Sequence, residues 1–275
     1  MSPAEVRRPA VAGSFYPRNP AELRDLVAGF LAAVDAEPEA ARGGIVPHAG
    51  LIYSGACAAH VFRRIALPPV VVVLAPNHTG HLGATGGASV WPRGAFATPL
   101  GDVQVNTAFA DALTTRCPLA AEDPFAHMGE HAVEVELPFL QVSGSTGSIV
   151  PIVLAWDDWP RSRSLAEALA ELVRSWPQTV LLLASSDMTH YEHADRAATK
   201  DRMAFAAIER LDGQGLLDAC HRHNITMCGR APAAVMLEAA RLLGASAARL
   251  VDYRHSGRVT GDNASVVASA GFVVS

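Results

Sequence analysis

The chain has 275 residues, of which 50% are hydrophobic and 18% are charged, and its net charge is −5. This composition excludes an intrinsically disordered protein, and 22 basic against 27 acidic residues leave no basic surplus of the kind that nucleic-acid-binding proteins carry. Its apolar runs, such as residues 70–75, are far shorter than the ~20 residues of a membrane-spanning helix.

The N-terminal residues and the cysteines bear on the cellular compartment. Residues Met1 to Arg8 lack the apolar core of a signal peptide. The four cysteines form no Cys-x-x-Cys pair, which is typical of free thiols in a reducing compartment. We therefore expect a cytoplasmic protein that binds neither nucleic acid nor a membrane.

Strand-like and helix-like segments alternate along the chain. Apolar runs predict strands at 44–47, 70–75, 149–155 and 179–184, with further β-rich segments at 246–253 and 265–274. Helical patterns follow at 20–35, 54–65, 161–175, 194–210, 214–222 and 230–243. This alternation predicts an α/β fold, with a central mixed sheet flanked by helices in a single domain spanning residues 1–275.

Three histidines directly follow predicted strands. His48 follows residues 44–47, His78 follows 70–75, and His190 follows 179–184. The carboxyl ends of the strands form the ligand crevice in open α/β sheets, and two imidazoles with one anionic ligand are a common set for a single metal ion. The three histidines indicate either a metal site or separate capping residues at the strand ends.

A second cluster surrounds His131. A helix that starts at Glu130 would place Glu130 and Glu134 on one face. The spacing is not His-Glu-x-x-His, so a zinc protease of that class is excluded. The two carboxylates form either a polar wall that orients a ligating histidine or a solvated helix start.

Cys228 lies just before the predicted helix 230–243, where the helix dipole favours a thiolate. The alternative is a small buried hydrophobic side chain, which is also the interpretation for Cys57, Cys117 and Cys220. Residues 253–263 are rich in turn-forming residues and predict either a pocket rim or a hairpin connection. The motifs of α/β-hydrolases, P-loops and dinucleotide-binding folds are absent from the sequence.

Short motifs along the chain resemble those of the Memo family, the AmmeMemoRadiSam system protein B group. They span nearly the whole chain in the expected order: Arg8 to Pro17, Pro47 to Gly50 with Tyr53-Ser54-Gly55, Pro76-Asn77-His78, Glu130-His131 to Glu134, Leu137 to Leu140, Ser185-Ser186-Asp187 to His190-Tyr191, Cys228-Gly229-Arg230, and Ser256-Gly257 to Gly261-Asp262.

The resemblance implies a fold similar to the class III, or LigB-like, extradiol dioxygenases. Those enzymes bind Fe(II) through two histidines and a glutamate, and a further histidine acts as acid and base. By position, His48 and His78 match the two histidine ligands, and Cys228 takes the place of the glutamate. His190 matches the acid/base histidine, and Asp187 is expected to orient it.

The resemblance also implies a pocket around these residues. His131 falls on a polar pocket position, and we expect Glu130, Tyr53 and Arg230 to line the same pocket. Leu51 stands where many members have an aromatic residue. Because thiolate and imidazole ligands suit several metals, Fe(II) or Cu is expected and Zn is the alternative.

Three functions remain open on these residues. The first is a metal-dependent oxidoreductase with a dioxygenase-like pocket and an unknown substrate. The second is a non-catalytic effector that binds a small molecule or a peptide, with Arg230 accepting an anionic group. The third, implied by the family name, is an accessory component that acts with a radical SAM enzyme and an AmmeMemoRadiSam partner protein.

Overall fold

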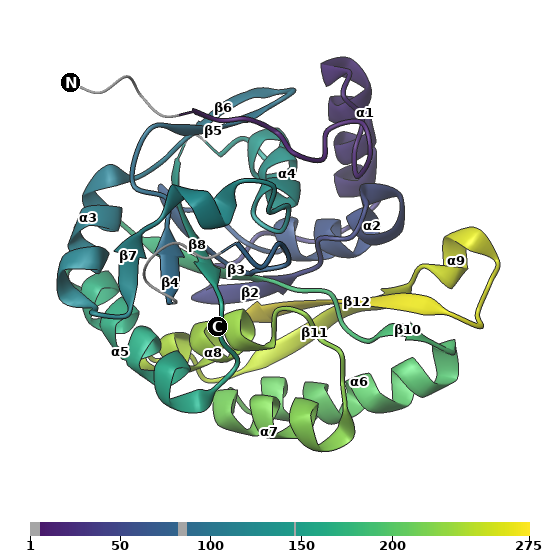
Figure 1. Cartoon of the computed structure of the whole chain (residues 1–275). Coiled ribbons are helices and arrows are strands. Elements are labelled where there is room, and N and C mark those ends of the chain that lie inside the picture. Colours follow the sequence, from purple (N-terminus) through teal and green to yellow (C-terminus); the bar gives the residue numbers. More distant parts are fainter. Residues whose placement is uncertain (1–5, 82–86, 146) are drawn as a thin grey trace.

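The computed structural model describes residues 6–81, 87–145 and 147–275, so the expectation about the first residues of the chain lies largely outside it (Figure 1). The strands are β1 (Val6–Arg7), β2 (Gly43–Val46), β3 (Val70–Pro76), β4 (Ala88–Val90), β5 (Ala95–Thr98), β6 (Gly101–Gln104), β7 (Ala120–Glu122), β8 (Ser148–Leu154), β9 (Val180–Ser185), β10 (His190–Glu192), β11 (Ala248–His255) and β12 (Val266–Val274). The helices are α1 (Pro20–Ala32), α2 (Leu51–Phe62), α3 (Thr107–Arg116), α4 (Leu137–Val142), α5 (Trp159–Ser175), α6 (Ala194–Glu209), α7 (Gly213–His223), α8 (Arg230–Leu242) and α9 (Gly257–Thr260), with 3-10 turns η1 (Pro124–His127) and η2 (Glu134–Glu136).

A mixed sheet forms the centre of the molecule. Among the described residues its strand order is β10-β12-β2-β9-β3-β8-β4-β7, and β11 pairs with β12 outside this path. The four strands β2, β9, β3 and β8 are parallel, whereas β12 and β4 run antiparallel to their neighbours β2 and β8. The prediction of an α/β fold with a central mixed sheet flanked by helices is therefore confirmed.

Helices cover both faces of the sheet (Figure 1). Val70 and Val72 of β3 pack into a core with α3 and α5–α8, whereas Val71 and Val73 pack into a second core with α1, α2 and α4. Because side chains alternate across a strand, a strand covered on both faces must be apolar at every position. This explains why the sequence of β3 is a continuous apolar run.

Six short strands were not predicted. β4 and β7 extend the large sheet, β10 starts it at the other edge, and β1, β5 and β6 form a separate three-stranded sheet. Each has two to four residues, which is too short for a periodic pattern to stand out from its surroundings. The predicted hairpin connection is confirmed, because β11 and β12 pair antiparallel and α9 lies between them.

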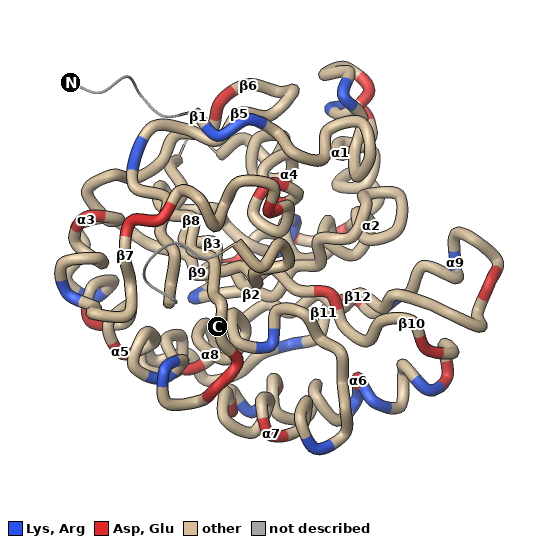
Figure 2. Tube along the Cα trace, in the orientation of Figure 1, with Lys and Arg blue, Asp and Glu red and all other residues tan. Residues whose placement is uncertain are grey.

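Charged residues of both signs, and free cysteines, are found where the composition led us to expect them. Basic and acidic residues are interspersed along α6 and α7 (Figure 2). No described helix combines the length and apolar character needed to cross a bilayer. Cys57, Cys117 and Cys220 are free and buried, whereas Cys228 is only partly buried.

Candidate metal centre

Three neighbouring parallel strands bring three polar side chains to one edge of the sheet. β2, β9 and β3 lie side by side, and His48, Asp187 and His78 each follow the end of their strand by two residues. Parallel strands end on the same side of a sheet, so these side chains converge. Nε2 of His48 lies 3.8 Å from Oδ2 of Asp187.

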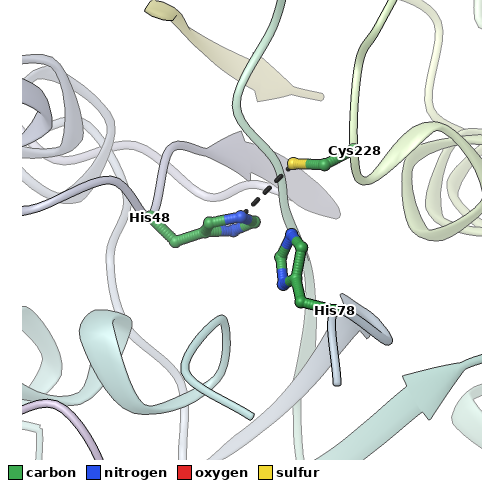
Figure 3. Close-up of side chains that lie close together, drawn as sticks. All are labelled: His48, His78 and Cys228. Carbon is green, nitrogen blue, oxygen red and sulfur yellow. Dashed lines mark hydrogen bonds between the residues drawn. The ribbon is translucent and has the colours of Figure 1, made fainter. Parts of the chain in front are cut away.

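Cys228 reaches the same place from the turn before α8. Its Sγ atom lies 3.3 Å from Nε2 of His48 and accepts the backbone N–H of Asp187 at 3.3 Å. The three side chains of His48, His78 and Cys228 point toward one another (Figure 3), and one donor atom from each lies within 4.8 Å of the others. The structure therefore brings together the three predicted metal ligands.

Gly229 allows the turn to approach this closely. A Cβ atom at Gly229 would lie 2.4 Å from the carbonyl oxygen of Ser185 and 2.5 Å from Cβ of Ser186. Both atoms belong to the end of β9 or its following turn, so any side chain at this position would push Cys228 away from His48.

His48 is fully buried and is held as a neutral imidazole. Its Nδ1 atom lies 2.7 Å from Oγ of Ser185. Burial holds the pKa of His48 well below its usual value, and His131, His78 and His190 lower it further. A neutral imidazole with one nitrogen engaged leaves the other nitrogen available to a metal.

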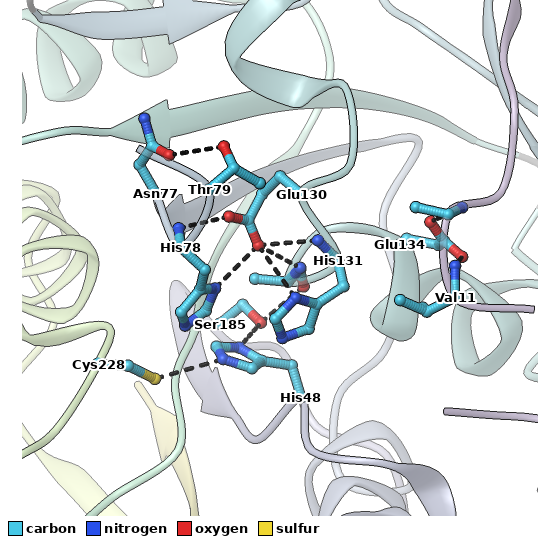
Figure 4. Close-up of polar contacts among 12 residues, drawn as sticks. Val11, His48, Asn77, His78, Thr79, Glu130, His131, Glu134, Ser185 and Cys228 are labelled. Atoms are coloured by element: carbon cyan, nitrogen blue, oxygen red, sulfur yellow. Dashed lines mark hydrogen bonds and ion pairs between the residues drawn. The ribbon is translucent and has the colours of Figure 1, made fainter. Parts of the chain in front are cut away.

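His78 is oriented by Glu130 (Figure 4). Its Nδ1 atom donates to Oε1 of Glu130 at 2.9 Å, and its second nitrogen faces Cys228. Burial alone would lower the pKa of His78, but hydrogen bonds to Cys228 and Glu130 raise it to about 10. Metal-binding histidines commonly donate their second ring N–H to a carboxylate, as His78 does to Glu130.

Glu130 does not start a helix, so the condition for placing Glu130 and Glu134 on one helix face is not met. Residues 130 and 131 are irregular, residues 132 and 133 form a turn, and the next regular element is η2. The Glu130 carboxylate accepts the N–H groups of His78, His131 and Ala132, and such local bonds compete with helix formation. Because both Glu130 and Glu134 are buried, the interpretation as a solvated helix start also fails.

Glu134 points away from the histidines toward the N-terminal segment. It forms a buried ion pair with Arg7 and accepts the hydroxyl of Tyr16 and the backbone N–H groups of Ala10 and Val11. Figure 4 shows Glu134 beside Val11, apart from the histidines. Arg7 also donates to the backbone carbonyls of His127 and Glu130. This network ties the turn that carries Glu130 and His131 to β1.

His190 and Asp187 lie beside Cys228. One donor atom of each lies within 4.8 Å of the others in a second possible metal-binding group, and a third such group consists of His78, Glu130 and His131. Nδ1 of His190 lies 3.0 Å from the carbonyl oxygen of Thr226, which can only accept a hydrogen bond. Nδ1 therefore carries the proton. Burial lowers the pKa of His190, and hydrogen bonds to the backbone of Met188 and Thr226 act against this shift, so Nε2 is the unprotonated nitrogen of a neutral imidazole.

Asp187 titrates in the neutral range. It accepts the hydroxyl of Ser269 at 3.2 Å. Burial raises the pKa of Asp187 to about 7, against the opposing effect of that hydrogen bond. Such a carboxyl is suited to donate or accept a proton near pH 7.

Two cavities open on either side of the His78 and Cys228 side chains. One of about 430 Å³ is lined by Phe15, the histidines 48, 78, 131 and 190, and Asp187. The other, of about 500 Å³, is lined by Trp156, Asp157 and Arg230 among others, and His78, Thr226 and Cys228 line both. A cavity of about 650 Å³ between α1 and α2 shares no lining residue with either.

Two predicted pocket residues are placed differently from the histidines. Arg230 lines the second cavity, but its guanidinium is paired with Asp157 at 2.5 Å. Tyr53 of α2 is not among the residues that line either cavity, although its ring lies beside Gly50, which lines the first.

Four residues at this site were not expected from the sequence. Ser185 and Glu136 stand behind His48, and Phe15 and Tyr191 line the first cavity. Glu136 offered one signal, since it is a carboxylate between apolar neighbours in the stretch 132–140. Tyr191 adopts a φ of 59° at an irregularity in the pairing of β10 with β12, next to His190.

Similar proteins match nearly the whole chain. A family model described as Memo-like protein matches residues 7–273. A MEMO1 family protein of Aquifex aeolicus is 41% identical over 98% of this chain and 98% of its own length, and one of Methanopyrus kandleri is 39% identical over 97% and 98%. One of Methanothermobacter thermautotrophicus is 37% identical over 96% and 99%. The chain therefore belongs to the Memo-like protein family.

Proposed function

We propose that this protein is a metal-dependent oxidoreductase with a dioxygenase-like pocket, and that His48, His78 and Cys228 hold its metal ion. The observation that carries the proposal is the convergence of their three donor atoms to within 4.8 Å of one another from separate elements of the fold. Two imidazoles and a thiolate are ligand types that transition metals prefer.

The donor set favours a redox metal. Iron and copper both accept imidazole and thiolate ligands, and zinc is the alternative with a water as fourth ligand. When bound, such an ion supplies a binding position for substrate and, for iron or copper, electron transfer. With Cys228 in place of a carboxylate, the ligand set differs from that of catechol-cleaving dioxygenases, so we do not assign that reaction.

The side chains of the first cavity supply binding and proton transfer. His190 lines the cavity of about 430 Å³, where its unprotonated Nε2 could take a proton from a substrate group. Asp187, with a pKa of about 7, is the second group able to move a proton. The ring of Phe15, 4.7 Å from that of His131, forms an apolar wall of the same cavity.

Metal content of purified variants tests the ligand set. The protein is purified anaerobically and analysed by ICP-MS as wild type, His48→Ala, Cys228→Ala and His190→Ala, with Cys220→Ala as a matched control for loss of a buried thiol. We expect a near-stoichiometric metal in wild type, Cys220→Ala and His190→Ala, and its loss in the other two. Wild-type protein that stays free of iron, copper and zinc after reconstitution would contradict the proposal.

Turnover then tests the role of His190. The assay uses a substrate with which the enzyme consumes O₂ or its metal becomes reduced. His190→Ala is expected to keep the metal, but its turnover rate is expected to fall by a factor of ~10²–10⁴. Loss of the metal in this variant, or unchanged turnover, would assign His190 a different role.

A further inference from the structure

Ser185, the last residue of β9, makes three contacts of hydrogen-bond length at once. Its Oγ atom lies 2.7 Å from Nδ1 of His48, 2.7 Å from Oε1 of Glu136 and 2.8 Å from the backbone carbonyl oxygen of Ala132. Ser185, Glu136 and Ala132 are all buried, so water does not compete for these contacts. Figure 4 shows the Ser185 contact behind the His48 ring, on the side away from Cys228.

Counting donors and acceptors fixes where the protons lie. A serine hydroxyl has one proton to donate and two lone pairs to accept with. The carbonyl of Ala132 can only accept, so it takes the Ser185 proton. If that proton is not shared between two acceptors, the other two contacts are hydrogen bonds only when both His48 Nδ1 and Glu136 Oε1 carry a proton and donate it to Ser185.

We propose that Glu136 is a protonated acid that donates to Ser185, and that together they hold His48 in the tautomer with its proton on Nδ1 and its lone pair on Nε2, facing Cys228. This inference rests on the proposed metal site, because Nε2 is the atom that would bind the metal. Glu136 and Ser185 are thus positioning residues that act through His48.

The surroundings of Glu136 independently favour its neutral form. Its other oxygen, Oε2, has no hydrogen-bond partner within the described part of the chain, and an ionised carboxylate would leave that charge unpaired in the core. Burial holds the pKa of Glu136 well above its usual value, against the effect of the Ser185 contact, and the Asp187 carboxylate raises it further.

Metal affinity of four variants separates this role from a merely structural one. Glu136→Gln keeps a donor to Ser185 and is neutral, so we expect metal affinity within about threefold of wild type. Glu136→Leu removes the donor, and Ser185→Ala removes the acceptor of His48 Nδ1–H. Changes behind a ligating histidine typically cost ~10–100-fold in affinity, and we expect this range for Ser185→Ala and a smaller loss of at least threefold for Glu136→Leu. Ser162→Ala, at a buried serine of α5, is the control.

Two results of these affinity measurements would overturn parts of the proposal. A Glu136→Gln protein as weak as Glu136→Leu would mean that the carboxylate charge attracts the metal, and would overturn the neutral acid. Wild-type affinity in Ser185→Ala would overturn the orienting role.

The tautomer of His48 is measured in the metal-free protein, so this test holds even if the proposed function fails. Long-range ¹H–¹⁵N spectra of the imidazoles, assigned with His48→Ala, are expected to show a proton on Nδ1 in wild type and Glu136→Gln, and a mixture of tautomers in Ser185→Ala. A proton on Nε2 in wild type would overturn the proposal. Absence of metal from wild type with the proton on Nδ1 would contradict only the proposed metal site.

Discussion

The Sγ atom of Cys228 lies 3.3 Å from Nε2 of His48, although 180 residues separate them along the chain. The contact depends on two backbone features. His48 follows the end of β2, and Cys228 sits in a turn that packs against the neighbouring end of β9 through Gly229. The metal-site hypothesis therefore depends as much on a glycine as on the ligands themselves.

Gly229→Ala is expected to destabilise the protein and to weaken metal binding. The new Cβ atom would lie 2.4 Å from a backbone oxygen of Ser185, so the turn that carries Cys228 must shift. Overpacking of this kind typically costs about 1–3 kcal/mol. Urea unfolding and metal titration measure both effects.

Gly29→Ala is the matched control for this substitution. Gly29 lies inside α1, and a Cβ atom there meets nothing within 4 Å. Because alanine favours a helix over glycine, this variant is expected to gain about 0.5–1 kcal/mol and to leave metal binding unchanged. Equal effects of the two substitutions would contradict the role of Gly229.

Glu130→Gln is expected to weaken metal binding by ~10–100-fold, because the carboxylate orients His78 through its Nδ1–H. Metal titration followed by competition with a chelator measures the change. Glu122→Gln, at a half-exposed carboxylate paired with Arg93, serves as the control and should bind as wild type does. If both variants bind metal equally well, Glu130 does not orient a ligand.

Arg7→Met is expected to lower the free energy of unfolding by about 3–5 kcal/mol, because it leaves the buried Glu134 carboxylate without its cation. Arg93→Met, which breaks the ion pair with Glu122 on the surface, is expected to cost less than about 1 kcal/mol. Chemical denaturation of both variants tests the contrast. An Arg7→Met loss as small as that of Arg93→Met would contradict a buried ion pair at this position.

His127 is expected to make the protein less stable in mild acid. It is fully buried and its Nε2 atom donates to the carbonyl of Ser89 at 2.9 Å. Burial lowers the pKa of His127 to about 4, whereas in the unfolded chain it titrates near its ordinary value of 6.5. As pH falls from 6.5 toward 4, His127 becomes protonated in the unfolded state but stays neutral in the folded state. The free energy of unfolding therefore falls by up to about 3 kcal/mol.

His127→Gln isolates this contribution. The glutamine amide can donate to the same carbonyl but does not titrate, so the loss of stability between pH 7 and pH 4 should be smaller in the variant. Urea unfolding at several pH values measures the difference. Identical pH dependence in the two proteins would show that His127 does not take up a proton on unfolding.

The sequence predicted the parts of the fold that have long, strongly patterned segments. β3 is apolar at every position because both of its faces are covered, and this signal is local and unambiguous. The short strands β4 to β7 have no comparable signal, since three or four residues leave little pattern to detect. Likewise, the turn at Glu130 could not be predicted, because the partners that hold its carboxylate lie in other segments.

For the site, the sequence by itself determined that His48 and His78 follow predicted strands, which made a shared edge of the sheet an expectation. The parallel pairing of β2, β9 and β3 in the structure brings the two histidines to that edge. Only the tertiary structure decided that Glu130 supports His78, that Glu134 turns away to Arg7, and that Ser185 and Glu136 stand behind His48. The physical reason is that a local apolar pattern predicts each strand, and backbone pairing of parallel strands then brings their ends together. The partner of a buried carboxylate is instead selected by packing between segments far apart in the chain.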